Sequence, residues 1–481
     1  MTLCSDELIS RRNMMELLNR KKTGKVERPV KVLQFGEGNF LRAFVDYMID
    51  IANEQGKFNG DIVLVKPIEF GSLDRFHDQE CQYTVQLRGI VDGEPKRINR
   101  IVTSVADAVD AYGEYQKYAD YAKLDSLRYI VSNTTEAGIV YDDTDRLEME
   151  PPKSYPGKLT KFLYERYKHF NGAMDKGLVM LPVELIDDNG IHLKECVEKL
   201  AVLWNLEEGF KTWLDEACVF TSTLVDRIVT GYPRDEAEEL CKEFGYQDNL
   251  IVTGEPFALW VIESAKDISK EFPLPDAGLP VIFTDNQKPY KQRKVRILNG
   301  AHTSFVLASY LCGNDIVLES MQDELIFNFM KATIFDEVIP TLTLPKQDLI
   351  DFAEAVITRF NNPYVKHALL SISLNSVSKW RARCMPSFLE YIKNEGKLPT
   401  HLTFSLAALM AFYTGTEIRD KALIGHRDGA EYQILDDAAV LEFFAANSSK
   451  DAAEYTHAVL SNEHFWGEDF TKLAGVEEAE I

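Results

Sequence analysis

Long apolar runs are missing from this sequence. No stretch approaches the run of about 20 predominantly apolar residues that a membrane-spanning helix needs. The first thirty residues are charged and carry no apolar segment of the kind that a secretory signal requires. We therefore expect a protein of the cytoplasm that neither crosses a membrane nor is exported.

Closely spaced cysteines are missing as well. The seven cysteines are scattered along the chain, and no two of them form a C-x-x-C pair. A disulfide framework uses an even number of cysteines and a zinc site uses close pairs, so neither is indicated. The distribution favours a reducing compartment, and no metal ion is expected.

Positive charge is scarce, because 53 Lys and Arg face 76 Asp and Glu and leave a net charge of −23. Such a charge repels phosphate backbones and anionic membranes, so we expect no nucleic-acid or membrane partner. A small anionic substrate would need a local basic pocket. The 481 residues, 45% of them hydrophobic, suffice for two or more domains with large cores. The sequence leaves the oligomeric state open between a monomer and a small homo-oligomer.

A strand, a glycine turn and a helix follow one another near the N-terminus. The segment Pro29 to Phe35 predicts a buried strand, Gly36 and Gly38 follow it, and residues 39–51 have the apolar spacing of an amphipathic helix. In this context a dinucleotide's pyrophosphate can sit against the helix N-terminus. The third glycine of G-x-G-x-x-G is absent because position 41 is Leu. An ordinary glycine turn is therefore the alternative.

Two more predicted strands end in polar residues. Glu69 lies shortly beyond the strand predicted at 61–65, where an acidic group favours NAD over NADP by accepting from ribose hydroxyls. The nearby Lys66 weakens this inference, and a solvated surface carboxylate is the alternative. The strand 128–132 runs into the polar turn 133–138, and ligands of open α/β sheets bind at such strand ends.

Strand and helix patterns alternate up to about residue 283, and helical patterns dominate from about residue 290. Further strands are predicted at 83–87, 97–102, 178–181 and 280–283, and helices at 108–122, 158–167, 348–360, 367–375, 402–413 and 436–446. The sequence thus predicts an α/β fold. An N-terminal Rossmann-type NAD-binding domain over residues 1–286 precedes a mostly α-helical substrate and catalytic domain over residues 287–481.

Lys294, Asn299 and His302 fall within one apolar helical segment. At about 100° per residue Lys294 and His302 lie roughly 80° apart, and Asn299 lies within about 60° of His302 on its other side. One cleft could receive all three. A partly desolvated lysine trades protons near neutral pH, and an Asn N–H can stabilise charge on a carbonyl oxygen, which suits ketone reduction. The alternative is a solvated Lys294 with an Asn299 and His302 that cap or brace a helix.

Five motifs in order along the chain resemble the polyol-specific long-chain dehydrogenases of the mannitol dehydrogenase type. They are Gly36-x-Gly38-x-Phe40-x-Arg42-Ala43, Asn133-Thr-Thr-Glu136-x-Gly138, Val225-Asp226-Arg227-Ile228, Glu255-Pro-Phe257 and Lys294-x4-Asn299-x2-His302. The last motif is the family's signature. Other stretches, among them 222–235 and 362–367, look like those of the members that act on sugar acids.

The resemblance implies an NAD-dependent, metal-free hydride transfer that interconverts D-tagaturonate and D-altronate in hexuronate breakdown. It implies that Lys294 is the general acid and base, that Asn299 positions the carbonyl, and that His302 orients the substrate and the lysine. The expected cofactor contacts are Phe35, Gly36, Gly38, Asn39, Phe40, Glu69, Asn133, Thr134 and Glu136. The expected substrate contacts are Glu184, Asp226, Lys379 and Arg381.

The sequence departs from the mannitol enzymes at one position. Those enzymes share the carbonyl contact between two Asn residues, and the second aligns here with Glu184. A substrate carboxylate also needs a cation, and residues 378–383 contain Lys379, Arg381 and Arg383. Lys379 is our first choice because a basic residue in this region contacts the substrate in the family. A solvated basic helix end is the alternative.

Three other functions stay open. The same chemistry could act on fructuronate and give mannonate, or the chain could be a mannitol-like polyol dehydrogenase. A non-catalytic NAD-binding sensor of sugar acids is the alternative from a different class. The intact set of Lys294, Asn299 and His302 argues against the sensor.

Overall fold

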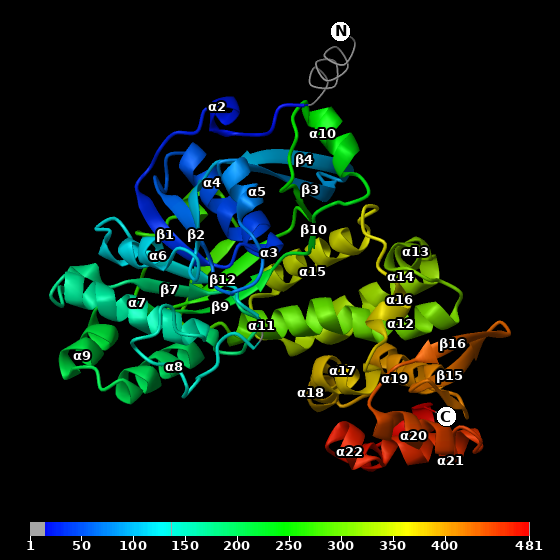
Figure 1. Cartoon of the computed structure of the whole chain (residues 1–481). Helices are drawn as coiled ribbons and strands as arrows, with labels where there is room; N and C mark the ends of the chain where they lie inside the picture. Colours follow the sequence, from blue (N-terminus) through cyan, green and yellow to red (C-terminus); the bar gives the residue numbers. More distant parts are fainter. Residues whose placement is uncertain (1–14, 136, 481) are drawn as a thin grey trace, which may run out of the picture. The chain divides into compact units, whose positions relative to one another are not determined.

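The computed structural model describes residues 15–135 and 137–480, and the chain forms two compact units (Figure 1). The first comprises Lys96–Gln287 with the described part of Met1–Arg88. The second comprises Gly89–Pro95 with the described part of Lys288–Ile481.

A six-stranded parallel sheet lies at the centre of the first unit, in the order β5-β2-β1-β6-β7-β8. In chain order its strands are β1 (Val30–Phe35), β2 (Asp61–Lys66), β5 (Val105–Asp110), β6 (Tyr129–Ser132), β7 (Val179–Pro182) and β8 (Val219–Phe220). This is the order 3-2-1-4-5-6 of the Rossmann fold. The order reverses between β1 and β6, and ligands of such sheets bind outside the carboxyl ends of the strands at that point.

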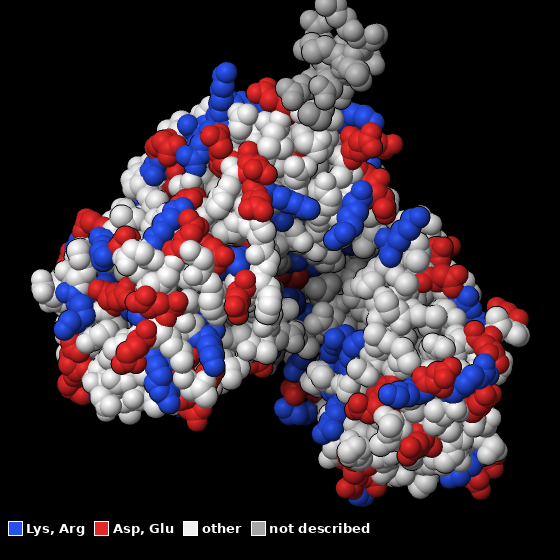
Figure 2. All heavy atoms as spheres, viewed as in Figure 1, with Lys and Arg blue, Asp and Glu red and all other residues white. Residues whose placement is uncertain are grey.

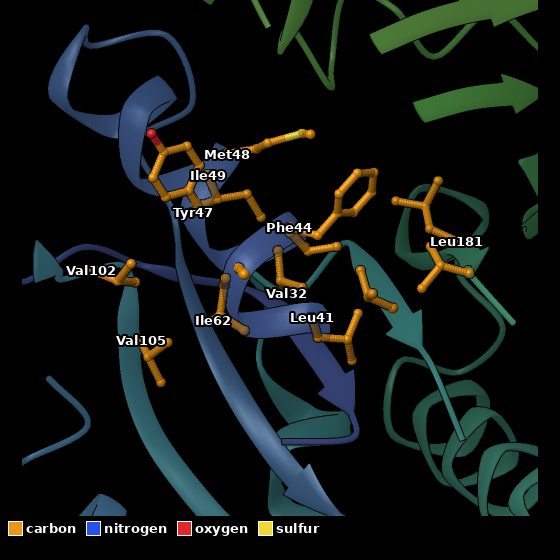
Figure 3. Close-up of a cluster of buried hydrophobic side chains, with 14 of the residues drawn as sticks. Val32, Leu41, Phe44, Tyr47, Met48, Ile49, Ile62, Val102, Val105 and Leu181 are labelled. Carbon is orange, nitrogen blue, oxygen red and sulfur yellow. The ribbon is translucent and has the colours of Figure 1, made fainter. Parts of the chain in front are cut away.

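Both faces of this sheet are buried because neighbouring residues of each strand enter different cores. Val32 and Ile62 pack on one face with Phe44 from the helical segment α3 (Asn39–Leu41), η1 (Arg42–Asp46) and α4 (Tyr47–Glu54) (Figure 3). Leu33 and Val63 pack on the other face with residues of α6 (Tyr115–Asp120), α7 (Tyr155–His169), α8 (Asn189–Leu203) and α9 (Glu208–Glu216). Strands buried on two faces are apolar nearly throughout, and this pattern predicted β1, β2, β6 and β7 from the sequence.

Two smaller sheets and several short helices complete the first unit, although residues 89–95 of one sheet belong to the second unit. One sheet has the order β10-β11-β3-β4 and the other β13-β12-β9. Their strands are β3 (Tyr83–Val91), β4 (Glu94–Val102), β9 (Ser222–Asp226), β10 (Val229–Gly231), β11 (Val252–Gly254), β12 (Leu259–Glu263) and β13 (Val281–Thr284). The remaining helices of the described residues are α2 (Arg20–Thr23), α5 (Asp74–Asp78), η2 (Tyr121–Lys123), η3 (Met174–Lys176), α10 (Ala237–Phe244) and η4 (Pro275–Ala277).

The second unit is mainly helical. It begins with α11 (Lys288–Arg293), the π-helical turn η5 (Lys294–Asn299) and α12 (Gly300–Leu311). The helix α12 is buried on nearly all sides, as expected for a helix that is apolar all round. The later helices are α13 (Val317–Gln322), α14 (Glu324–Ala332), η6 (Thr333–Val338), η7 (Ile339–Thr341), α15 (Lys346–Phe360), α16 (Leu369–Ile372), α17 (Ser376–Arg383), α18 (Met385–Glu395), α19 (Thr400–Phe412), α20 (Ala438–Asn447), α21 (Ala452–Leu460), α22 (Glu463–Trp466), η8 (Phe470–Lys472) and α23 (Val476–Glu480).

The predicted fold class is confirmed, with three local corrections. The helix predicted at 108–122 is wrong at its start, because β5 extends to Asp110: Ala108 and Val109 point into opposite cores, as in a strand. The helix predicted at 367–375 is reduced to the four residues of α16. An antiparallel sheet of β14 (Ile418–Arg419), β15 (Ala422–Arg427) and β16 (Ala430–Ile434) was not predicted.

Two further observations concern membrane-spanning helices and the distribution of charge on the surface. Among residues 15–135 and 137–480, no helix is both long enough and apolar enough to cross a membrane. Lys and Arg side chains are interspersed with Asp and Glu over the face shown in Figure 2. The excess of acidic residues is therefore not gathered into one patch on this face.

Asp46 is a buried carboxyl group in η1, directly after the glycine turn and its first helical residues. The Tyr83 hydroxyl donates to Asp46 Oδ2 at 2.6 Å, and Oδ1 has no hydrogen-bond partner among the described residues. Burial raises the pKa of Asp46 to about 7, although the hydrogen bonds of Tyr83 and Gln34 act in the opposite direction. The folded protein therefore binds a proton at Asp46 more tightly than the unfolded chain does.

The exchange Asp46→Asn tests this assignment through the pH dependence of stability. Between pH 4 and about 7 the unfolded wild type releases the Asp46 proton before the folded protein does, so this group's contribution to stability falls as the pH rises. Asn cannot ionise and escapes this loss. We expect the variant to gain up to roughly 3 kcal/mol on the wild type between pH 5 and pH 8, measured by denaturant unfolding. If the variant and the wild type differ in free energy of unfolding by the same amount at pH 5 and at pH 8, the assignment is contradicted.

Candidate functional site

The glycine turn lies at the carboxyl end of β1, directly before the helical segment 39–54. Gly36 has a φ of +119°, and a Cβ there would approach the Asn133 carbonyl oxygen to 3.0 Å. Gly38 is extended, and a Cβ there would meet no heavy atom within 4 Å. Gly36 is therefore required by the backbone and its neighbour. Gly38 borders open space next to the free N–H groups of a helix N-terminus, where a phosphate group is favoured.

The aromatic residues on either side of this turn are packed into the protein. The buried Phe35 ring lies 5.1 Å from the Tyr155 ring, and the partly buried Phe40 ring stacks on Phe44 at 5.0 Å. Asn39 begins the helix, and its Oδ1 accepts a hydrogen bond from Arg42 Nη2 at 2.6 Å. These side chains hold the turn in shape, so ligand contacts here fall mainly to backbone groups.

Lys66 holds the loop that follows β2. Its buried ammonium donates to the carbonyl oxygens of Ile68, Glu69 and Phe70 at 2.9, 3.2 and 3.3 Å and pairs with Asp110 Oδ2 at 3.1 Å. The Glu69 side chain is exposed. The positive charge that weakened the inference of an NAD preference is thus engaged by the protein itself.

Glu184 holds the turn that follows β6. Thr134 donates to Glu184 Oε1 from its backbone N–H at 3.0 Å and from its hydroxyl at 3.1 Å, and Ser132 Oγ donates to Oε2 at 3.1 Å. Burial raises the pKa of Glu184, while these hydrogen bonds act against the rise. Asn133 is partly exposed at the start of the turn. Glu136 lies outside the described residues.

Arg227 joins three segments that are distant in the sequence. Its guanidinium donates to the carbonyl oxygens of Phe257 and Pro256, each at 3.0 Å, and of Ala43 at 2.5 Å. Burial lowers the pKa of Arg227 to about 10. Two of the sequence motifs and the helix after the glycine turn are thereby fixed to one another. Asp226 is buried beside Arg227 at the end of β9.

A cavity of about 630 Å³ lies among the loops after β2 and β6 and the start of α7. Its lining includes the largely exposed apolar side chains of Ile68 and Val140, together with Thr134 and Lys153. Apolar walls with a few polar groups are typical of sites for small organic ligands. The cavity lies at the carboxyl ends of the strands, where the sheet order predicts a ligand.

Lys294, Asn299 and His302 lie on one continuous helical segment of the second unit, and all three side chains are partly exposed. Lys294 to Asn299 form the π-helical turn η5, and His302 belongs to the first turn of α12. The angles predicted for a regular α-helix therefore do not apply, because a π-helix has a wider turn. Such turns within α-helices are frequent at functional sites.

His302 has an unusual environment for an imidazole. Its ring packs on Phe360 at 4.2 Å between centroids and lies 5.5 Å from the His367 ring. Nε2 is buried and has no hydrogen-bond partner in the described part of the chain. Burial lowers the pKa of His302 well below 6.5, and the neighbouring His367 and nearby cations act in the same direction. His302 is therefore neutral at physiological pH.

The basic side chains of α17 point in two directions. Lys379 and Arg383 are four residues apart, on one face of the helix, and both lie near enough to His302 to lower its pKa. Arg381 is exposed, and its Nη1 donates to the His464 carbonyl oxygen at 3.3 Å. The structure therefore brings Lys379 and Arg383 to His302 and directs Arg381 towards α22.

Lys66 and Ser132 shape the site but were absent from the predicted set. Arg383 was one of the three cations named for the substrate carboxylate, although Lys379 was the first choice. Ser132 meets Glu184 across 52 residues, which no local pattern reveals. In the described ranges, no group of three or more His, Cys, Asp and Glu side chains is arranged to hold a metal ion.

The fold and the site define a class of protein in which a Rossmann-type unit is combined with a helical unit that carries Lys294, Asn299 and His302. The family model of the mannitol dehydrogenase Rossmann domain matches residues 30–275, and that of the mannitol dehydrogenase C-terminal domain matches residues 286–479. The chain belongs to the mannitol dehydrogenase family. The resemblance seen in the five sequence motifs is thus confirmed.

Curated relatives match along almost the whole chain. The chain is 45% identical over 466 residues to altronate oxidoreductase from Yersinia enterocolitica. The alignment covers 95% of this chain and 94% of the relative. It is 43% identical over 462 residues to altronate oxidoreductase from Bacteroides thetaiotaomicron, which covers 96% of this chain and 95% of the relative.

Solved structures share the fold at lower identity. Mannitol 2-dehydrogenase from Pseudomonas fluorescens, in a ternary complex with NAD and D-mannitol, has a TM-score of 0.64 at 22% identity and covers 97% of this chain and 95% of its own. A substrate-free D-sorbitol dehydrogenase has a TM-score of 0.76 at 19% identity and covers 97% of this chain and 100% of its own.

The exchange Lys66→Met tests the role of Lys66 as the support of the loop after β2. Methionine retains the aliphatic volume but leaves three carbonyl oxygens and Asp110 without their donor. We expect a loss of roughly 1–3 kcal/mol in the free energy of unfolding, measured by denaturant titration. The exposed Lys57, exchanged in the same way, is the matched control and should cost less than about 0.5 kcal/mol. Equal effects of the two exchanges would contradict this role.

Proposed function

We propose that this chain is a cytoplasmic, NAD-dependent oxidoreductase that interconverts D-tagaturonate and D-altronate in hexuronate catabolism. The observation that carries this proposal is the 45% identity to an altronate oxidoreductase over 95% of this chain and 94% of the relative. The Rossmann domain and the set of Lys294, Asn299 and His302 support the same reaction class.

The residues around the glycine turn fit a dinucleotide. Open space beside Gly38 and the free N–H groups of the following helix would hold the pyrophosphate. The exposed Glu69 would accept from the adenosine ribose, and because Lys66 is engaged by the loop carbonyls, it is not available to pair with a 2′-phosphate. The turn of Asn133 and Thr134 lies next to Gly36 and would contact the same cofactor. When bound, NADH supplies the hydride that reduces the ketone.

The second unit would supply the proton and hold the carbonyl group. Protonated Lys294 gives a proton to the carbonyl oxygen as its charge grows, and the Asn299 amide stabilises that charge. Neutral His302 orients the substrate and the lysine through Nε2. In the direction of oxidation the neutral amine of Lys294 removes the hydroxyl proton of altronate.

The exchange Lys294→Ala tests the substrate and the acid together. Purified wild type should oxidise NADH with tagaturonate, and the variant should lose at least roughly 100-fold in kcat because its general acid is missing. The exposed Lys331, exchanged for Ala, is the control and should leave the rate unchanged. The readout is NADH absorbance, with fructuronate and fructose in parallel.

The outcomes of this assay separate the alternatives. A preference for fructuronate or fructose would keep the mechanism and replace the substrate. The absence of NADH oxidation with every substrate would favour the NAD-binding sensor. Full activity of Lys294→Ala would remove the proposed acid.

The pH profile of altronate oxidation tests the assignment of His302. Oxidation should rise with pH because it needs the neutral amine of Lys294. Since the pKa of His302 lies well below 6.5, its titration should not contribute near pH 6.5. We expect His302→Gln to lower kcat by roughly 10- to 100-fold and to leave the inflection of the profile in place. An inflection near pH 6.5 that disappears in this variant would overturn the assignment.

A further inference from the structure

We propose that Arg383, beside Lys379, binds the carboxylate of the sugar-acid substrate and selects acids over neutral sugars. This inference rests on the proposed function, which requires a cation for that carboxylate. Both residues lie on the same face of α17, which also meets α12 through Arg383. The site would therefore be built by two helices of the second unit.

Arg383 has most of its hydrogen-bonding capacity to spare. A guanidinium carries five N–H donors, and Arg383 makes one hydrogen bond with the described residues, from Nη1 to Thr303 Oγ1 at 3.3 Å. It forms no ion pair with a carboxylate of the described chain. Its remaining donors can take a carboxylate in the bidentate geometry that guanidinium groups favour.

Lys379 offers a second, partly used cation. Its ammonium has three donors and gives one hydrogen bond, to the Ile372 carbonyl oxygen at 2.9 Å. The acidic group near it is Asp436, whose carboxylate already accepts from the Tyr413 hydroxyl and the Asp437 N–H. Asp436 therefore offsets part of the charge of Lys379, whereas no carboxylate of the described residues raises the pKa of Arg383.

Burial of these cations has a cost that an anion would offset. Both side chains are partly buried, and burial lowers the pKa of Arg383 and of Lys379. Two like charges held together at reduced hydration attract a carboxylate strongly, in spite of the net charge of −23 for the whole chain.

Arg383 lies near His302, the residue proposed to orient the substrate. Thr303, which accepts its hydrogen bond, is the next residue after His302. Arg383 and Lys379 are both near enough to His302 to lower its pKa, so a substrate held beside His302 would lie close to both cations. Arg381, which is directed to His464, lies outside this arrangement and serves as a natural control.

The test compares Arg383→Met, Arg383→Lys and Arg381→Met in the full-length enzyme with tagaturonate and NADH. Arg383→Met should raise KM for tagaturonate by roughly 10- to 100-fold, as expected for a lost charge-assisted bond, and leave KM for NADH within about twofold. Arg383→Lys should give an intermediate KM because lysine keeps the positive charge but cannot bind a carboxylate in the bidentate geometry of a guanidinium group. Arg381→Met should behave as the wild type.

A purely structural role of Arg383 is tested by Thr303→Val, which removes its hydrogen bond and keeps its charge. If Arg383 only braces α12, this variant should reproduce the effects of Arg383→Met, and the proposal fails. The proposal also fails if Arg383→Met and Arg381→Met raise KM equally, or if KM for NADH rises as much as KM for tagaturonate. If Arg383→Met does not fold, the KM of Arg383→Lys decides. Wild type that does not turn over tagaturonate would instead refute the proposed function.

Discussion

Buried cations that donate to backbone carbonyl oxygens fix the loops of the first unit. A buried charge is costly unless hydrogen bonds replace its hydration. Lys66 meets this condition with three carbonyl oxygens and Asp110, Arg227 with three carbonyl oxygens, and Arg166 with the carbonyl oxygens of residues 122, 124, 127 and 176. Lys66 and Arg227 fix segments next to the glycine turn or its helix. The shape of the dinucleotide site thus depends on these side chains, which need not contact a ligand.

The cations of α17 in the second unit differ in this respect. Lys379 and Arg383 each give one hydrogen bond to the described residues, where Lys66 and Arg227 use most of their donors. A cation whose donors are saturated holds the protein together, and a cation whose donors are largely unused can bind an anion. The same distinction applies to His302, whose Nε2 is buried without a partner. It gives a physical criterion for separating structural residues from binding residues where the residue type alone does not.

Some parts of the candidate site could be predicted from the sequence, and others could not. The strand, the glycine turn and the helix at 30–54 were readable because their signals are local. The substrate contact expected of Glu184 stays a prediction, whereas its hydrogen bonds to Ser132 and Thr134, which support the turn after β6, could not be predicted because no spacing reveals such long-range bonds. The predicted angles between Lys294, Asn299 and His302 assumed a regular helix. The segment instead contains a π-helical turn, which the apolar pattern did not indicate.

The sequence by itself determined the class of fold, the family and the identity of the lysine, asparagine and histidine, because apolar periodicity and contiguous motifs are written within a few residues of one another. The tertiary structure alone decided which cations are engaged and which can bind a ligand. Lys379, Arg381 and Arg383 have the same charge in the sequence, and only the packing of α17 separates them. The physical reason is that a hydrogen bond to a distant carbonyl oxygen exists only after the chain has brought the two groups together.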